Sequence, residues 1–162
     1  MGAGKSYLGK QIALQLGCSF IDLDQVIELA EGLTIQSYFD RNGEDSFRIL
    51  ERNTLLRLIN SQTDFVMACG GGTPCFFDNI QQMKQAGKVI WLNPSEPVLI
   101  NRLKKNQANR PLLASVTPGG LSAFIVEQLS NRRNFYQQAN WEIKDDQPEI
   151  SLVINWIKYG QD

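Results

Sequence analysis

The stretch Gly2-Ala3-Gly4-Lys5-Ser6, which continues as YLGKQIALQL to residue 16, joins a glycine-rich turn to a segment with helical periodicity. Glycines let successive backbone N–H groups turn toward one anion, and the amino end of a helix adds its positive dipole. Lys5 would reach the β- and γ-phosphates of a nucleoside triphosphate, and the Ser6 hydroxyl would bind Mg²⁺. We therefore predict a phosphate-binding loop that opens a helix over residues 4–16. The alternative is a glycine-rich turn that carries a lysine by chance.

Beyond this loop, short apolar runs alternate with segments of helical periodicity. Strands are expected at residues 20–22, 65–69, 89–92 and 141–143. Helices are expected at residues 24–31, 34–41, 44–60, 76–86, 95–104, 119–138 and 149–159. The alternation predicts one three-layer α/β domain over residues 1–162 with a parallel sheet. The polar, proline-bearing segment 105–118 is expected to form a lid loop.

The chain begins inside the phosphate-loop pattern G-x-x-x-x-G-K-S/T. Its first glycine would lie one residue before Met1, and the strand that should lead into the loop is missing. We expect the chain to be truncated at this end, and the missing strand to leave open backbone edges on two neighbouring strands.

Composition narrows the class of protein. The 162 residues are 43% hydrophobic and 20% charged, which is typical of one globular domain. A net charge of −1 gives no basic excess for nucleic acid. The chain has no histidine, which excludes Ser-His-Asp, Cys-His and His-metal chemistry. No stretch reaches membrane length and no signal peptide opens the chain, so we expect a cytoplasmic protein.

Two carboxylates follow the first expected strand. Asp22 and Asp24 are two residues apart, so an extended chain would point both the same way, toward a ligand at the strand's carboxyl end. Asp22 could hold Mg²⁺ through water, and Asp24 could accept a hydrogen bond from an acceptor hydroxyl and act as base or orienter. In the alternative interpretation, Asp24 only caps a helix that begins at Gln25.

An arginine and a glycine triplet supply candidate groups for the acceptor. Arg48 is spaced to pair with Glu44 and Glu51, either as a structural ion-pair ladder or as an oriented fork for a substrate carboxylate. Gly70-Gly71-Gly72 end the run Phe65–Cys69, where they would let a ligand approach the backbone; a flexible turn is the alternative.

Two more arginine segments lie near the expected lid. Arg110, in the lid, could bring a cation to the transferring phosphoryl group and span ATP and acceptor. Arg132 and Arg133 point to different sides of a helix, so at most one should face a pocket, and both could simply be solvated.

Together the segments GAGKS, D-L-D, G-E-x-x-F-R-x-x-E, G-G-G, R-P-L-L and R-x-x-x-Y resemble the shikimate kinase family, in its order and spacing. The resemblance implies a three-layer α/β/α P-loop kinase fold with a five-stranded parallel sheet, of which the first strand is missing here. It implies ATP-dependent phosphorylation of the 3-hydroxyl of shikimate, within aromatic amino-acid biosynthesis.

The resemblance also implies roles for individual residues. Shikimate is expected to bind Asp24, Arg48 and Arg132, with Gly71 and its neighbours Gly70 and Gly72. The phosphates of ATP are expected at Gly2–Tyr7 and Arg110, and Mg²⁺ at Ser6 and Asp22. Lys5, Asp24 and Arg110 are the expected catalytic residues.

Tyr7 departs from the family, which usually has a small hydroxyl residue there; its bulk could reshape the α-phosphate contact. Residues 144–148 (KDDQP) occupy the region that usually flanks adenine. We expect a monomer that binds ATP and shikimate and neither nucleic acid nor membrane. The alternatives are a gluconate-kinase-like or nucleoside monophosphate kinase, and a non-catalytic kinase-like module.

Overall fold

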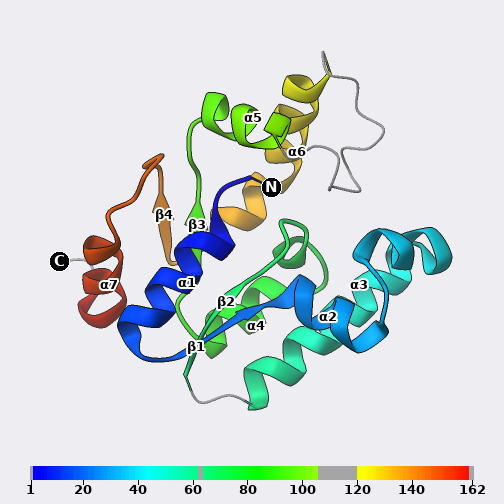
Figure 1. Cartoon of the computed structure of the whole chain (residues 1–162), viewed down its shortest axis with the longest axis horizontal. Helices are drawn as coiled ribbons and strands as arrows, with labels where there is room; N and C mark the ends of the chain where they lie inside the picture. Colours follow the sequence, from blue (N-terminus) through cyan, green and yellow to red (C-terminus); the bar gives the residue numbers. More distant parts are fainter. Residues whose placement is uncertain (1, 62–63, 106–119, 161–162) are drawn as a thin grey trace.

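The computed structural model describes residues 2–61, 64–105 and 120–160. The helices of this part are α1 (Lys5–Leu16), α2 (Leu23–Glu31), α3 (Ile35–Ser61), α4 (Asn79–Ala86), α5 (Glu96–Lys105), α6 (Leu121–Tyr136) and α7 (Ile150–Tyr159), with a 3₁₀ turn, η1 (Thr73–Cys75). The strands are β1 (Ser19–Asp22), β2 (Phe65–Ala68), β3 (Ile90–Leu92) and β4 (Trp141–Ile143). The predicted order of helices and strands is confirmed (Figure 1). Of the expected lid, residues 106–118 lie outside the described part of the chain, Arg110 among them.

The strands form two parallel pairs and not one sheet. Ser19 pairs with Phe65 at the start of β1 and β2, and Ile90 pairs with Trp141 at the start of β3 and β4. The described residues therefore do not form the five-stranded sheet that the family resemblance implied. A cavity of about 450 Å³ lies between the pairs and is lined by β2 and β3 but not by β1 or β4. Within the described part of the chain, β2 and β3 each pair on one side only, and their other edges face this cavity.

Helices cover both faces of the strands and so form the three predicted layers. Successive residues of β2 point to opposite faces. Val66 packs with α1 and α7, whereas Met67 packs with α2 and α3. Helix α1 packs on β1, β2 and α7, and its apolar side also reaches β3 and β4 (Figure 1). Gly9 allows this close packing, because a Cβ atom there would lie only 2.7 Å from the Phe20 ring.

The expected helices 34–41 and 44–60 are confirmed: they lie within α3 on either side of a kink at Gly43, whose φ of 78° is not helical. Another segment differs from its predicted boundaries. The expected helix 76–86 starts later, at Asn79, because Phe77 has a positive φ of 54° and interrupts the chain between η1 and α4. None of the described helices is both long and apolar enough to cross a bilayer.

Candidate active site

The phosphate-loop segment enters α1 as the sequence predicts. Gly2 and Gly4 have φ values of 71° and 91°, in the left-handed region that favours glycine, and α1 begins at Lys5. Ala3 packs against the apolar cluster that joins α5 and α6. Arg102 of α5 donates to the carbonyl oxygen of Ala3 at 3.2 Å and lies 3.5 Å from that of Gly2. The loop is therefore fixed to α5 by one apolar and one polar contact.

Arg102 also ties this loop to the segment 144–148. Its Nη2 donates to the backbone carbonyl of Asp146 at 2.9 Å. The Asp146 carboxylate in turn accepts from the backbone N–H and hydroxyl of Ser95, at 2.6 and 2.9 Å. The segment expected to flank adenine thus lies beside the phosphate loop. The sequence held no signal for Arg102, which is about 100 residues from its partners in the loop.

The predicted magnesium ligands lie side by side. The Ser6 hydroxyl donates to Asp22 Oδ2 at 2.7 Å. A hydroxyl and a carboxylate oxygen suit Mg²⁺, which keeps several waters and takes its other ligands from phosphates. The pair therefore fits a metal held between this loop and a bound triphosphate. Tyr7, the neighbour of Ser6, has a largely exposed side chain.

Asp24 lies inside α2, so two expectations about it are wrong. The chain turns helical at Leu23, and Asp24 therefore neither extends parallel to Asp22 nor caps a helix at Gln25. Its side chain turns instead toward Gly70, where a Cβ atom would lie 3.2 Å from Asp24 Oδ1. Asp22 therefore lies beside Ser6 and Asp24 lies beside Gly70, so the two carboxylates can serve different ligands.

The surroundings of Asp24 raise its pKa to about 6. Burial is the largest cause, because it disfavours the charged carboxylate. The negative charges of Glu51 and Asp22 raise the pKa further, whereas Lys5 lowers it. Lys5, at the phosphate loop, is therefore close enough to attract the carboxylate of Asp24.

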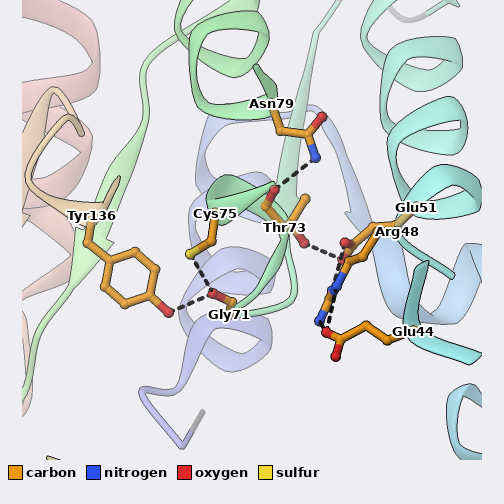
Figure 2. A network of polar contacts seen from close by, with 8 residues as sticks. All are labelled: Glu44, Arg48, Glu51, Gly71, Thr73, Cys75, Asn79 and Tyr136. Carbon is orange, nitrogen blue, oxygen red and sulfur yellow. Dashed lines mark hydrogen bonds and ion pairs between the residues drawn. The ribbon is translucent and has the colours of Figure 1, made fainter. Parts of the chain in front are cut away.

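Arg48 is held by its predicted partners. Its side chain bonds to Glu44 Oε1 at 2.8 Å and to Glu51 Oε2 at 2.9 Å, and only 5% of the residue is exposed (Figure 2). Glu51 is 1% exposed, and its second oxygen accepts from the Thr73 hydroxyl at 2.6 Å. A buried carboxylate with both oxygens engaged holds the guanidinium in one orientation.

The glycine triplet packs directly on these groups. A Cβ atom on Gly72 would lie 2.7 Å from both Nη1 and Nη2 of Arg48, so any larger residue would displace the guanidinium. A Cβ atom on Gly70 would lie 3.3 Å from Glu51 Oε1 as well as beside Asp24. Close approach of side chains therefore explains the glycines at positions 70 and 72, which a merely flexible turn does not.

Arg132 faces inward on α6, whereas Arg133 is exposed, as the helix geometry predicts. Both candidate carboxylate binders lie near η1. Arg48 packs on Gly72 and on the Phe76 ring, and Tyr136, four residues after Arg132 in α6, bonds to Gly71. Burial raises the pKa of Cys75 in η1, and the positive charges of Arg132 and Arg48 both lower it in part. Arg48 and Arg132 are therefore on elements that meet at η1, although they are 84 positions apart in the sequence.

Two further residues of this site had no assigned role from the sequence. Thr73 was not singled out, because a threonine after three glycines has no special pattern. Tyr136 belongs to the R-x-x-x-Y segment, and its hydroxyl donates to the Gly71 carbonyl at 2.7 Å (Figure 2). Both contacts join distant segments, so the sequence held no spacing that could reveal them.

Comparison with known proteins identifies the family. The family model for shikimate kinase matches residues 1–157. The chain is 43% identical to a shikimate kinase of Phocaeicola vulgatus over 154 residues, which cover 95% of this chain and 87% of the relative. A shikimate kinase of Bacteroides fragilis is also 43% identical, over 98% of this chain and 90% of the relative.

Solved structures agree with the sequence comparison. The crystal structure of shikimate kinase from Bacteroides thetaiotaomicron has a TM-score of 0.87 and 36% identity, and the match covers 98% of this chain and 92% of that one. Shikimate kinase from Acinetobacter baumannii in complex with shikimate has a TM-score of 0.86 and 31% identity, over 98% and 86% of the two chains. The protein described here therefore belongs to the shikimate kinase family.

Proposed function

We infer that this protein transfers the γ-phosphate of ATP to shikimate, in aromatic amino-acid biosynthesis, and we propose the 3-hydroxyl as the acceptor. The observation that carries the proposal is the buried Arg48, fixed by Glu51 and packed on Gly72, with the Arg132 helix α6 bonded to the same glycine triplet through Tyr136. Two guanidinium groups beside one loop suit a small substrate with a carboxylate. The family match and the shikimate-bound relative support the same substrate.

Shikimate would bind between the glycine triplet and the two arginines. Arg48 and Arg132 would hold its carboxylate, and Gly70–Gly72 would let the ring approach the backbone closely. The carboxyl group of Asp24, turned toward Gly70, would then face the ring hydroxyls. With a pKa near 6, Asp24 is mostly ionised at neutral pH and can accept the proton of the attacking hydroxyl.

ATP would place its phosphates against Gly2–Tyr7, where the backbone of the loop and the amino end of α1 favour an anion. Lys5 would neutralise charge on the β- and γ-phosphates, and Ser6 and Asp22 would hold Mg²⁺, which spreads the charge of the transferring group. We propose that Arg110 adds a further cation during transfer. Asp24 and Lys5 are near enough to interact, so acceptor and donor sites would meet between them.

A coupled assay of ADP release tests this function. The protein is incubated with ATP, Mg²⁺ and one acceptor at a time: shikimate, gluconate or AMP. We expect release with shikimate alone. Release with gluconate or AMP instead would favour another small-molecule kinase, and no release with any acceptor would favour a non-catalytic module.

A lysine pair supplies the matched control. Lys5→Met should abolish ADP release because the phosphates lose their cation, while the fold stays intact. Lys10→Met changes an exposed lysine of the same helix and should leave the rate nearly unchanged. Surviving activity in Lys5→Met would show that the phosphate loop is assigned wrongly.

A further inference from the structure

The Tyr136 side chain connects α6 to the glycine triplet. It is the last residue of α6, and its hydroxyl donates to the Gly71 carbonyl oxygen at 2.7 Å (Figure 2). Its ring packs on Trp91 of β3, with 5.5 Å between the ring centroids. The phenol is therefore held at both ends: the ring by the strand and the hydroxyl by the loop.

Arg132 lies on the same face of α6 as Tyr136. The two residues are four apart in this helix, and both line a small pocket. Burial raises the pKa of Tyr136, and the nearby positive charge of Arg132 lowers it in part. The bond from the Tyr136 hydroxyl to the Gly71 carbonyl therefore joins the glycine triplet to the helix face that carries Arg132.

The other end of the glycine triplet is fixed by a separate contact. Thr73 donates to Glu51, which also holds Arg48. The loop is therefore joined to α3, the helix of Arg48, on one side and to α6, the helix of Arg132, on the other. Without the Tyr136 bond, the Thr73–Glu51 bond to α3 would remain, and the hydrogen bond between the loop and α6 would be lost.

We propose that Tyr136 is a positioning residue for the acceptor: by bonding to Gly71 from the face of α6 that carries Arg132, it sets the distance between the α6 guanidinium and the glycine loop. The proposal rests on the proposed function, in which Arg132 and the loop meet shikimate. Tyr136 itself need not touch the substrate. Small errors in the placement of binding groups are costly, so loss of this contact should weaken binding of shikimate and leave ATP binding unaffected.

Tyr136→Phe tests the proposal because it removes the hydroxyl and keeps the ring on Trp91. We expect the KM for shikimate to rise roughly tenfold and the KM for ATP to stay within about twofold of the wild type. Tyr159→Phe is the matched control, since Tyr159 is exposed on α7 and should change neither constant. An unchanged KM for shikimate, or an equal rise in both constants, would overturn the proposal.

A double-mutant cycle separates positioning from a general effect on the fold. In an Arg132→Ala background the phenol has no guanidinium to place, so Tyr136→Phe should raise the KM for shikimate by much less than in the wild type. Full additivity of the two changes would contradict the proposal. Failure of the proposed function is a different result: there the unaltered protein releases no ADP with shikimate.

Discussion

At the scale of single residues, the raised pKa of Asp24 bears both on stability and on the role in transfer that we propose for it. Its pKa of about 6 means that the carboxyl group is protonated below that pH and cannot accept the hydroxyl proton of shikimate. We expect kcat to fall as the pH drops through about 6, and Asp24→Asn to lower kcat by roughly 100-fold or more. Rates measured from pH 5 to 8 check this. A normal kcat in Asp24→Asn would remove Asp24 from the mechanism.

The same group should destabilise the fold at neutral pH. Its pKa is about 6 in the folded protein against an ordinary value of 3.8, so the folded state holds this proton more tightly than the unfolded state does. The contribution of Asp24 to stability is therefore most favourable below pH 3.8 and is lost as the pH rises through 6. Asp24→Asn should raise the free energy of unfolding at pH 7.5 by about 1–3 kcal/mol. Urea unfolding measures this, with the exposed Asp45→Asn as control.

Gly72 is the residue whose size matters most directly for Arg48. Its φ of −83° is open to any residue, so Gly72→Ala adds only the methyl group that would meet the guanidinium at 2.7 Å. We expect Arg48 to be displaced and the KM for shikimate to rise at least about tenfold. Gly87→Ala, where an added Cβ meets nothing within 4 Å, is the control. Equal KM values in the two variants would show that the position of Arg48 does not govern binding.

At the scale of elements, the contact between α3 and η1 depends on one hydroxyl. Thr73 and Glu51 are both buried, and their bond of 2.6 Å joins the helix of Arg48 to the glycine triplet. Thr73→Val leaves a buried carboxylate oxygen without its donor and should cost about 1–3 kcal/mol of unfolding free energy relative to Thr73→Ser. Urea unfolding of the two variants gives the difference. Equal stability would mean that the hydroxyl does not support Glu51.

Elements and contacts within them could be predicted from the sequence, because they depend on local spacing. Arg48 reaches Glu44 and Glu51 since residues three and four apart are neighbours on a helix. The late start of α4 could not be predicted, because a left-handed phenylalanine at position 77 has no sequence signal. The contact of Tyr136 with Gly71 spans 65 residues and depends on how α6 packs, which no local pattern encodes.

At the scale of the whole molecule, the layers follow from the alternation of strands and helices, but the sheet is divided. Apolar residues on both faces of β2 predicted that helices cover both sides, and Val66 and Met67 do pack into separate clusters. The cavity lies between the unpaired edges of β2 and β3. Helix α1 still connects the two strand pairs, because its apolar side packs with residues of both.

The proposed site as a whole draws on segments from most of the chain. Its groups come from the phosphate loop, β1, α2, α3, the glycine triplet and α6, and the sequence identified these groups by type. It did not show how the segments are arranged in space, which depends on packing. The central claim is that the convergence of Arg48 and Arg132 makes a carboxylate site that faces Asp24 and the phosphate loop.

A crystal structure with shikimate and ADP bound tests this claim most directly. We predict that a shikimate carboxylate oxygen lies within about 3 Å of a guanidinium nitrogen of both Arg48 and Arg132. The ring hydroxyls should point toward Asp24, with the ADP phosphates on Gly2–Ser6. Shikimate bound with its carboxylate touching neither arginine would contradict the account.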